Sequence, residues 1–410
     1  MNAADARRVR QVCVLVAAWG MASGCGGGAP SSAETPAAAS PQAQATPAAS
    51  ASPAASEQSP AQQPGPADSS VPETAPAADP TPPAATAPAA DPGAASVAAL
   101  PSLRGVSLAG AEFAETSLPG TFQGNYTYPT TDEIDHFVAL GMNVFRLPFR
   151  WERLQQQQLA AFDAAEQGRI DALVSYATAK GAYVLIDPHN YARYYGAVIG
   201  EGVPASAFAD FWSKLATHFK DNPRVLFGLM NEPNTMSTEL WLADANAAIA
   251  AIRATGATNL ILVPGNAWTG AHSWLDASYG TPNAQVMLGI VDPLDNFAIE
   301  VHQYLDGNAA GTDMGTCVSS TVGSERLAAF TGWLAENGLR GFLGELGAGT
   351  SATCLAAIDD MLAYMDARPQ QWLGWAYWAA GPWWGGSVGN IEPVNGQDVP
   401  QTAVLVQHVP

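Results

Sequence analysis

Positive charge is scarce in this 410-residue chain, because 17 Lys and Arg residues stand against 37 Asp and Glu residues, for a formal net charge of −20. The few basic residues form no stripe or long run, so nucleic acid and other anionic polymers are poor partner candidates. An uncharged polymer fits the composition better. The chain also holds 12 Trp residues, whose aromatic faces suit stacking on such a polymer.

Aromatic residues are missing from the front of the chain. The stretch from Ala29 to Ala95 contains none and consists almost entirely of Ala, Pro, Ser, Thr, Gln, Asp and Glu. Such a segment cannot bury enough apolar surface to offset the entropy lost on ordering. We therefore expect residues 26–97 to form a disordered Pro/Ala/Ser-rich linker and residues 98–410 to form one large domain.

A hydrophobic run long enough to span a bilayer is lacking at the start of the chain. Arginines between Arg7 and Arg10 are followed by the apolar stretch 12–22, which is too short for a mature transmembrane helix. Small residues before Cys25 suit a signal peptidase, so we expect a signal peptide over residues 1–25, and export. The segment resembles the end of a bacterial lipobox, although Ala22 replaces the usual Leu. Two fates stay open. Cys25 is either lipidated, which anchors the protein to the outer bacterial cell surface, or the signal peptide is cleaved in the ordinary way and the protein is secreted.

Cysteine is also scarce, with four residues in all. Cys13 would leave with the signal peptide, and Cys25 is either removed or acylated. Cys317 and Cys354 then remain as an even pair in an oxidising compartment, which favours a disulfide between them. Two free buried thiols are the alternative.

The expected domain alternates short apolar runs with stretches of helix length. The strands expected from these runs span residues 103–108, 143–149, 182–187, 225–231, 259–263, 297–304, 340–345 and 372–378. The expected helices span residues 131–140, 164–180, 205–220, 238–255, 324–337 and 353–367, and the last helix must be short. This alternation predicts a (β/α)8 TIM barrel. A doubly wound open sheet is the main rival, but no glycine-rich phosphate fingerprint follows the first strand.

The segment 225–234 is the most informative part of the domain, because an apolar run ends abruptly in Asn231-Glu232-Pro233. Consecutive apolar residues are typical of a buried parallel strand, and Pro233 should end its pairing. Glu232 would then sit on a rigid element in apolar surroundings, which keep a carboxyl protonated near neutral pH, as a general acid requires. A Glu that only hydrogen-bonds a turn is the alternative.

Polar residues collect at the ends of other strands as well. The period of two in segment 300–304 places Glu300, His302 and Tyr304 on one face, pointing into the barrel. We expect Glu300 to be a buried structural carboxylate paired with Arg or His. Further strand ends carry Arg146, Asp187, His189, Glu345 and Trp378. Active sites of TIM barrels lie at this end of the strands.

Two carboxylates facing one cleft are the groups that glycoside hydrolysis needs. Glu232 would protonate the leaving oxygen and Glu345 would attack the anomeric carbon. Arg146 and Tyr304 would favour the ionised form of Glu345. Asn231 could donate to the substrate 2-hydroxyl, and the Trp at the end of the eighth strand would offer a floor for sugar stacking.

Several strings resemble glycoside hydrolase family 5, in particular its secreted endo-β-1,4-glucanases. They are residues 143–149, Asp187 to Tyr191, Asn231 to Pro233, His302 to Asp306 and Gly344-Glu345, and the resemblance covers Leu103 to Gly381. It implies a retaining double displacement with Glu232 as acid/base and Glu345 as nucleophile. It further implies a non-proline cis peptide after Trp378 and matches a disulfide between Cys317 and Cys354. It also assigns supporting and substrate-binding roles to Arg146, His189, Asn231, His302, Tyr304 and Trp378.

Other functions stay open at this stage. A β-mannanase or a mixed-linkage β-glucanase would use the same catalytic pair, and a non-catalytic carbohydrate binder would need only aromatic surfaces. Candidate subsite aromatics are Tyr195, Trp268, Trp383 and Trp384. His189 and His302 match no metal signature in their spacing with carboxylates, so we expect no metal and no cofactor. We expect a monomer.

Overall fold

The computed structural model describes residues 100–277 and 280–410. Several predictions concern residues outside the described ranges and stay predictions. They are the signal peptide over residues 1–25, the lipidation of Cys25, the linker over residues 26–97 and the domain boundary at residue 98.

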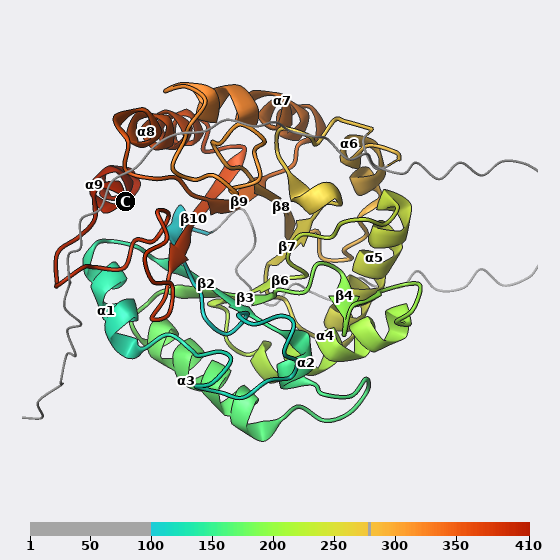
Figure 1. Cartoon of the computed structure of the whole chain (residues 1–410). Helices are drawn as coiled ribbons and strands as arrows, with labels where there is room; N and C mark the ends of the chain where they lie inside the picture. Colours follow the sequence, from blue (N-terminus) through green and yellow to red (C-terminus); the bar gives the residue numbers. More distant parts are fainter. Residues whose placement is uncertain (1–99, 278–279) are drawn as a thin grey trace, which may run out of the picture. The chain divides into compact units, whose positions relative to one another are not determined.

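The described chain forms a closed parallel barrel with the strand order β1-β10-β9-β8-β7-β6-β3-β2, and its helices form a ring around it (Figure 1). The barrel strands are β1 (Leu103–Leu108), β2 (Val144–Phe149), β3 (Tyr183–Pro188), β6 (Val225–Gly228), β7 (Ile261–Pro264), β8 (Phe297–His302), β9 (Gly341–Leu346) and β10 (Trp372–Ala380). All their pairings are parallel. The predicted (β/α)8 barrel is confirmed.

The helices alternate with the strands along the chain. They are α1 (Thr131–Ala139), α2 (Trp151–Leu154), α3 (Ala164–Ala179), α4 (Ala205–Phe219), α5 (Thr238–Ala254), α6 (Asn283–Val286), α7 (Val322–Asn337), α8 (Ala352–Asp366) and α9 (Pro400–Leu405). Short 3-10 turns are η2 (Ala267–Thr269), η3 (Met287–Gly289) and η4 (Val406–His408), and β4 (Arg193–Tyr194) pairs with β5 (Ala197–Val198) in a small hairpin outside the barrel. Among the described residues, none of the helices combines the length and the apolarity needed to cross a bilayer.

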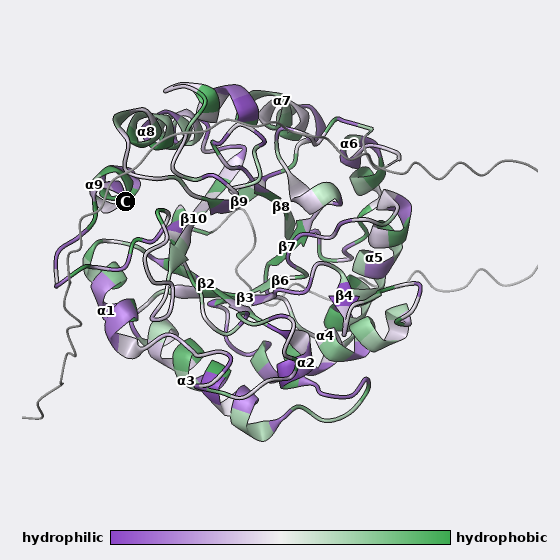
Figure 2. Ribbon diagram, viewed as in Figure 1, coloured by the Kyte–Doolittle hydropathy of each residue, from purple (hydrophilic) through white to green (hydrophobic). Residues whose placement is uncertain are grey.

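Among the apolar clusters of the described residues, two hold the barrel together. The larger one lies between the strands and the helices, and helices such as α1 and α7 accordingly carry hydrophobic and hydrophilic residues side by side (Figure 2). The smaller one fills the barrel interior, with Leu185, Leu226, Leu262 and Phe342 among its members. Because side chains alternate along a strand, Ala298 of this inner cluster shares its face with the polar residues that follow it on β8. The inner core therefore supports a polar layer above it.

Local sequence signals explain where several helices begin and end. Thr130 caps α1, and the Glu133 carboxylate accepts a hydrogen bond from the Thr130 backbone N–H. Asp163, Ser237 and Ser351 cap α3, α5 and α8 with their side chains. Gly181 follows α3 with φ of +86°, a left-handed conformation that suits a glycine after a helix.

The fourth barrel strand is shorter than predicted. Regular pairing of β6 ends at Gly228 rather than at Asn231. Beyond it the chain still bonds to its neighbours, with Leu229 N donating to Leu262 O at 3.0 Å and Asn231 N donating to Pro188 O at 3.0 Å. The short last helix α9 was predicted, and the barrel still closes because β1 pairs with β10 from Leu103 to Leu108.

Candidate active site

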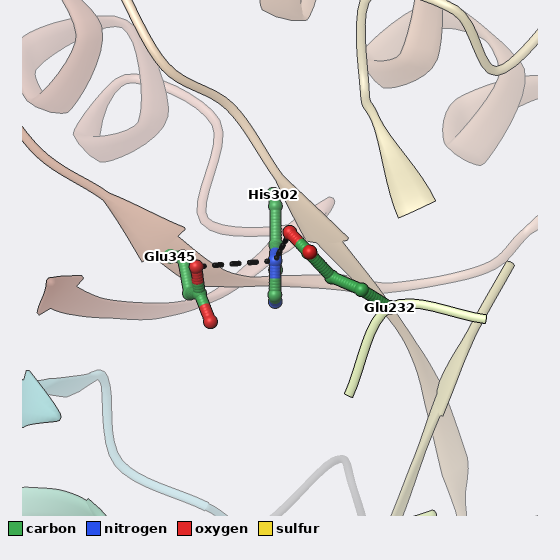
Figure 3. Close-up of side chains that lie close together, drawn as sticks. All are labelled: Glu232, His302 and Glu345. Atoms are coloured by element: carbon green, nitrogen blue, oxygen red, sulfur yellow. Dashed lines mark hydrogen bonds and ion pairs between the residues drawn. The ribbon is translucent and has the colours of Figure 1, made fainter. Parts of the chain in front are cut away.

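The polar residues predicted at the strand ends converge at one end of the barrel. Glu232, in the chain that follows β6, points toward His302 at the end of β8 and Glu345 on β9 (Figure 3). One carboxylate oxygen of each glutamate and one ring nitrogen of His302 all lie within 4.8 Å of one another. The two carboxylates therefore face each other across the barrel mouth, as predicted.

Glu232 lies at a sharp bend of the backbone. Its φ is +44°, a left-handed conformation that costs energy for a residue with a side chain and is common at functional sites. The expectation of apolar surroundings was wrong, because the carboxylate Oε1 accepts a hydrogen bond from His302 Nδ1 at 2.8 Å and the side chain is partly exposed. Glu232 therefore faces both solvent and a protein proton donor.

Glu345 is buried and surrounded by hydrogen-bond donors. Arg146 Nη1 donates to its Oε1 at 2.8 Å, and the Tyr304 hydroxyl donates to its Oε2 at 2.6 Å. Burial raises the pKa of the Glu345 carboxyl above its ordinary value, while the charges of His302 and Arg146 oppose that rise. The donors to Glu345 are thus those predicted from the sequence.

His302 connects the two glutamates. Its Nδ1 lies 2.8 Å from Glu232 Oε1 and 3.4 Å from Glu345 Oε2. Burial alone would lower the pKa of His302, but Glu345, Glu232 and Glu300 raise it to about 10. A protonated imidazole has no lone pair for a cation, so in that state the ring can only donate hydrogen bonds to the two carboxylates.

Arg146 organises the floor of the site from β2. Its Nη2 donates to Asn231 Oδ1 at 2.6 Å and lies 2.9 Å from Asp187 Oδ2. The same Asp187 oxygen contacts His189 Nδ1 at 2.9 Å, so Asp187 orients two neighbours. Burial and the charges of Arg146 and Arg150 hold the pKa of His189 well below its usual range.

Trp378 closes the other side of the site. The His189 ring stacks on it with 5.1 Å between ring centroids, and the Arg146 guanidinium lies 5.6 Å from its ring centre. Trp384 meets Trp378 edge-on at 5.7 Å and stacks on Phe113 at 5.6 Å. The Trp378-Ala379 peptide is cis, as the resemblance implied.

A cavity of about 890 Å³ opens beside Glu232 and His302. Tyr191, Arg193, Asn234, Trp268 and His272 belong to its lining, together with the loop after β8. This volume is in the range of sites that take extended ligands. The cavity and the carboxylate pair thus lie together at the same end of the barrel.

A family model for cellulase (glycosyl hydrolase family 5) matches residues 106–381. The chain belongs to glycosyl hydrolase family 5. It is 44% identical over 295 residues to Endo-beta-1,4-glucanase A of Emericella nidulans, an alignment that covers 71% of this chain and 87% of that protein.

Solved structures of the same family are also similar. An endo-beta-1,4-glucanase from Xanthomonas axonopodis pv. citri aligns with a TM-score of 0.73 and 48% identity over 75% of this chain and 98% of that chain. The structure of XacCel5A in complex with cellopentaose aligns with a TM-score of 0.74 and 46% identity over 75% of this chain and 99% of that chain.

The candidate subsite aromatics of this family 5 chain lie in different places. Trp268 lines the cavity with 42% of its surface exposed, and Trp384 packs against Trp378. Tyr195 lies in the hairpin of β4 and β5, where its ring meets Tyr194 edge-on, and Trp383 is exposed in the loop after β10. Their contacts with substrate stay a prediction.

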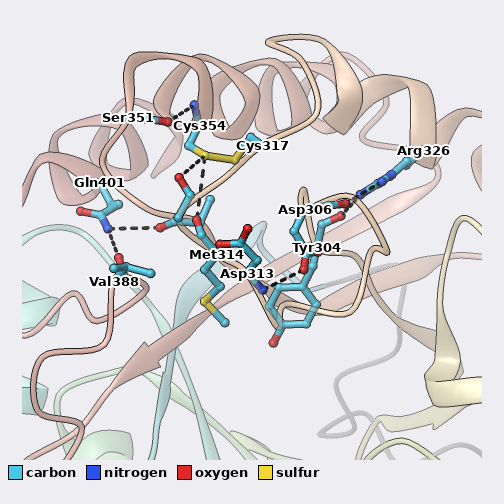
Figure 4. The surroundings of a disulfide bond; sticks show 12 residues. Tyr304, Asp306, Asp313, Met314, Cys317, Arg326, Ser351, Cys354, Val388 and Gln401 are labelled. Carbon is cyan, nitrogen blue, oxygen red and sulfur yellow. Dashed lines mark hydrogen bonds between the residues drawn. A yellow bond between two sulfur atoms is a disulfide. The ribbon is translucent and has the colours of Figure 1, made fainter. Parts of the chain in front are cut away.

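A disulfide between Cys317 and Cys354 ties the loop after β8 to the start of α8 (Figure 4). The pairing predicted from the cysteine count is confirmed. The tied loop contributes residues 308–310 and Thr312 to the cavity lining, and Gly349 N donates to Met314 O at 2.6 Å beside the disulfide. This bridge therefore fixes one wall of the family 5 cleft.

Sequence reasoning missed several residues of the cleft. Arg193 Nη1 donates to Tyr191 O at 2.5 Å and Arg193 Nη2 donates to Asn234 O at 3.1 Å, which joins the loops after β3 and β6. Tyr191 is the last residue of the string Asp187 to Tyr191, and Asn234 directly follows the string Asn231 to Pro233, so their positions were the available signal. Arg193 lies on the β4–β5 hairpin, whose sequence has no periodic pattern that predicts a strand.

Proposed function

We propose that this chain is a retaining endo-β-1,4-glucanase, which hydrolyses internal β-1,4-glucosidic bonds of cellulose-type polysaccharides. The observation that carries the proposal is the approach of a Glu232 oxygen and a Glu345 oxygen to within 4.8 Å. Retaining glycosidases hold their carboxyl groups about 5–5.5 Å apart, whereas inverting enzymes leave room for a water between them. The names of the relatives in family 5 support the same substrate.

In the first step Glu345 acts as nucleophile and Glu232 as acid. The Glu345 carboxylate attacks the anomeric carbon while the bond to the leaving sugar oxygen breaks, and Glu232 gives that oxygen its proton. Arg146 and Tyr304 hold the Glu345 oxygens in place through the hydrogen bonds described above. The electron pair of the broken bond leaves with the oxygen, and a glycosyl ester on Glu345 remains.

In the second step Glu232 acts as base. It takes a proton from water, which attacks the anomeric carbon and releases Glu345 as a carboxylate, so the product keeps the β configuration. His302, at 2.8 Å from Glu232, shares the proton that moves in both steps.

Asn231 and Trp378 are proposed to bind the sugar. Asn231 Oδ1 is occupied by Arg146, whereas Asn231 Nδ2 is buried without a hydrogen-bond partner among residues 100–277 and 280–410. A buried donor without a partner is costly unless a ligand satisfies it, which suits the substrate 2-hydroxyl. Trp378 offers an aromatic face for stacking on the sugar that reacts.

Location and assembly complete the proposal. From the sequence signals we infer an exported, monomeric enzyme, either secreted or anchored to the outer bacterial surface through Cys25. Mass spectrometry of the mature N-terminus tests these fates, because a lipidated N-terminal Cys25 means anchoring and an unmodified N-terminus means release.

Replacing the nucleophile tests the proposed reaction. In Glu345→Ala we expect turnover of soluble cellulose derivatives to fall at least about 10⁴-fold, because no covalent ester forms, and azide should restore product as a glycosyl azide. Glu336→Ala, which removes an exposed carboxylate from α7, should keep the parent activity. Undiminished hydrolysis by Glu345→Ala would overturn the assignment.

A substrate panel separates the alternatives. A β-mannanase or a mixed-linkage β-glucanase would share the catalytic pair, and a non-catalytic binder would show affinity without release of reducing ends. We expect the largest kcat/KM on β-1,4-glucan, with internal cleavage seen as a rapid fall in viscosity.

A further inference from the structure

A third carboxylate lies beneath the catalytic pair. Glu300 stands two residues before His302 on β8, so both side chains point into the barrel, and Glu300 is only 3% exposed. Its Oε1 lies 3.5 Å from Arg146 Nε and 3.7 Å from His302 Nε2, and it has no hydrogen-bond partner among the described residues. A buried charge with so few hydrogen bonds is expensive unless its electrostatic partners offset the cost.

Two glycines, one shortly before each catalytic glutamate in the chain, leave space for the Glu300 carboxylate. A Cβ at Gly344 would lie 2.2 Å from Glu300 Oε1, and a Cβ at Gly228 would lie 3.5 Å from Glu300 Oε2. Gly344 directly precedes Glu345, and Gly228 is the last residue of β6, which leads to Glu232. Because any side chain at Gly344 would displace it, the position of Glu300 is built into the site.

Glu300 faces the two cations of the site at once. Arg146 and His302 lie in the same buried volume and would repel each other without negative charge between them. His302 Nδ1 faces Glu232 and Glu345, whereas His302 Nε2 faces Glu300. Both ring nitrogens therefore point at carboxylates, an arrangement that suits an imidazolium with two N–H donors.

The other titratable groups around His302 and Glu300 come from several strands. They are Arg146 on β2, Asp187 and His189 at the end of β3, Glu232 after β6, Tyr304 after β8 and Glu345 on β9. Glu300 is the one of these acids that faces His302 Nε2, at 3.7 Å. Glu300 is also almost fully buried and is not among the residues that line the cavity, so we expect no direct contact with substrate.

We propose that Glu300 is a positioning residue for catalysis. Its charge keeps His302 doubly protonated. The Glu232–His302 pair therefore retains the proton that is later given to the leaving group. This inference rests on the proposed function. Burial lowers the pKa of His302, and Glu300 is among the three carboxylates that raise it to about 10, in agreement with this role. Without Glu300 the pair should lose its proton at lower pH.

Glu300→Gln tests the proposal, because it keeps the size of the side chain and removes the charge. We expect the alkaline limb of the kcat profile to move at least about one pH unit toward acid, which lowers kcat about ten-fold at a pH on that limb. KM should stay within about two-fold, since Glu300 does not touch substrate. Glu300→Asp keeps the charge and should restore most of the profile. A parent-like pH profile in Glu300→Gln would overturn the proposal.

A matched control uses a buried carboxylate at the other end of the barrel. Asp292 pairs with Arg253 at 2.8 Å, and both are almost fully buried. Asp292→Asn should lower the melting temperature and leave the pH profile of kcat unchanged. If Glu300→Gln behaves in the same way, its role is only structural and the proposal is wrong.

A measurement on the unaltered protein covers the case in which Glu300→Gln does not fold. Nitrogen-15 NMR of the His302 ring should show both nitrogens protonated at pH 8, and a neutral ring at pH 7 would overturn the proposal. This readout does not depend on activity. A wild-type chain that hydrolyses no β-glucan would instead contradict the proposed function, whatever the state of the ring.

Discussion

Glu232 and Glu345 have the same side chain, but their neighbours differ. Glu345 is buried and accepts hydrogen bonds from Arg146 and Tyr304, donors that favour a carboxylate. Glu232 is partly exposed and faces His302, from which it can regain a proton. The two roles of the proposed double displacement therefore follow from position and partners rather than from residue type.

Asp244 on α5 carries a prediction for stability. Its Oδ2 is buried with no hydrogen-bond partner in the described part of the chain, and its carboxylate lies against Gly200. Burial raises the pKa of Asp244 to about 7 from an ordinary value of 3.8. A raised pKa favours the folded state most below about pH 4, and this contribution is lost as the pH rises to about 7.

Asp244→Asn should therefore unfold less readily than the parent at pH 7.5, by about 1–3 kcal/mol, with a smaller gain at pH 4.5. Denaturant unfolding at both pH values measures this difference. Asp292→Asn is a control for which we expect the opposite change in stability. Burial would raise the pKa of Asp292, but Arg253 lowers it. Loss of this carboxylate should therefore reduce the free energy of unfolding more at pH 7.5 than at pH 4.5. A gain for Asp244→Asn that does not depend on pH would contradict this account.

Single residues could be predicted where they stand at strand ends. The period of two on β8 identified the shared face of Glu300 and His302, and abrupt strand ends identified Glu232 and Glu345. The double contact of Asp187 with Arg146 and His189 could not be predicted, because it depends on how two strands are placed side by side.

At the scale of elements, the loop from Leu305 to Thr321 owes its shape to local bonds. Asp306 accepts hydrogen bonds from Gly311 N at 3.0 Å and Asp313 N at 3.1 Å, and Arg326 of α7 donates to Asp306 O at 2.8 Å (Figure 4). The Cys317–Cys354 disulfide then attaches this loop to α8. The same loop packs Gly311 against the Tyr304 ring, so it supports a residue that contacts Glu345.

Removing the disulfide should affect both stability and substrate binding. For Cys317→Ser combined with Cys354→Ser we expect a loss of about 2–4 kcal/mol in the free energy of unfolding, because the bridge closes a segment of 37 residues. KM should rise more than kcat falls, since the loop lines the cavity while the glutamates stay in place. Calorimetry and steady-state kinetics measure the two effects, and unchanged KM with full stability would contradict this role.

Helices and strands could be predicted where the local sequence marks their ends, and not where their ends depend on contacts with other strands. Thr130 and Gly181 mark helix ends in the sequence, and the structure uses both. The chain after β6 was expected to stay a strand to Asn231, but it bends at Glu232 because its bonds go to Leu262 and Pro188 rather than to a regular ladder. The β4–β5 hairpin, only two residues per strand, gave no periodic signal.

At the scale of the whole molecule, eight apolar runs that alternate with stretches of helix length were enough to predict the barrel. Leu185, Leu226 and Leu262 fill its interior below the polar layer. The cavity beside the glutamates could not be predicted, because its walls come from loops whose lengths do not determine their course.

The acidic net charge carries a prediction for charged substrates. The cavity lining includes Glu115 and Asp276 in addition to the proposed catalytic acid, and the chain carries a formal charge of −20. KM for anionic carboxymethyl cellulose should therefore fall about two-fold or more between 10 and 200 mM salt, as repulsion is screened. An uncharged β-glucan serves as the control, and its KM should not change. Equal salt dependence for both substrates would contradict this electrostatic account.

The most direct test of the central claim is to trap the covalent intermediate. A 2-deoxy-2-fluoro cellobioside with a good leaving group should inactivate the enzyme, and peptide mass spectrometry should find one fluoroglycosyl group on Glu345. The account predicts this ester, and predicts none in Glu345→Ala. A label on another residue, or turnover with inversion of the anomeric centre and no label, would contradict it.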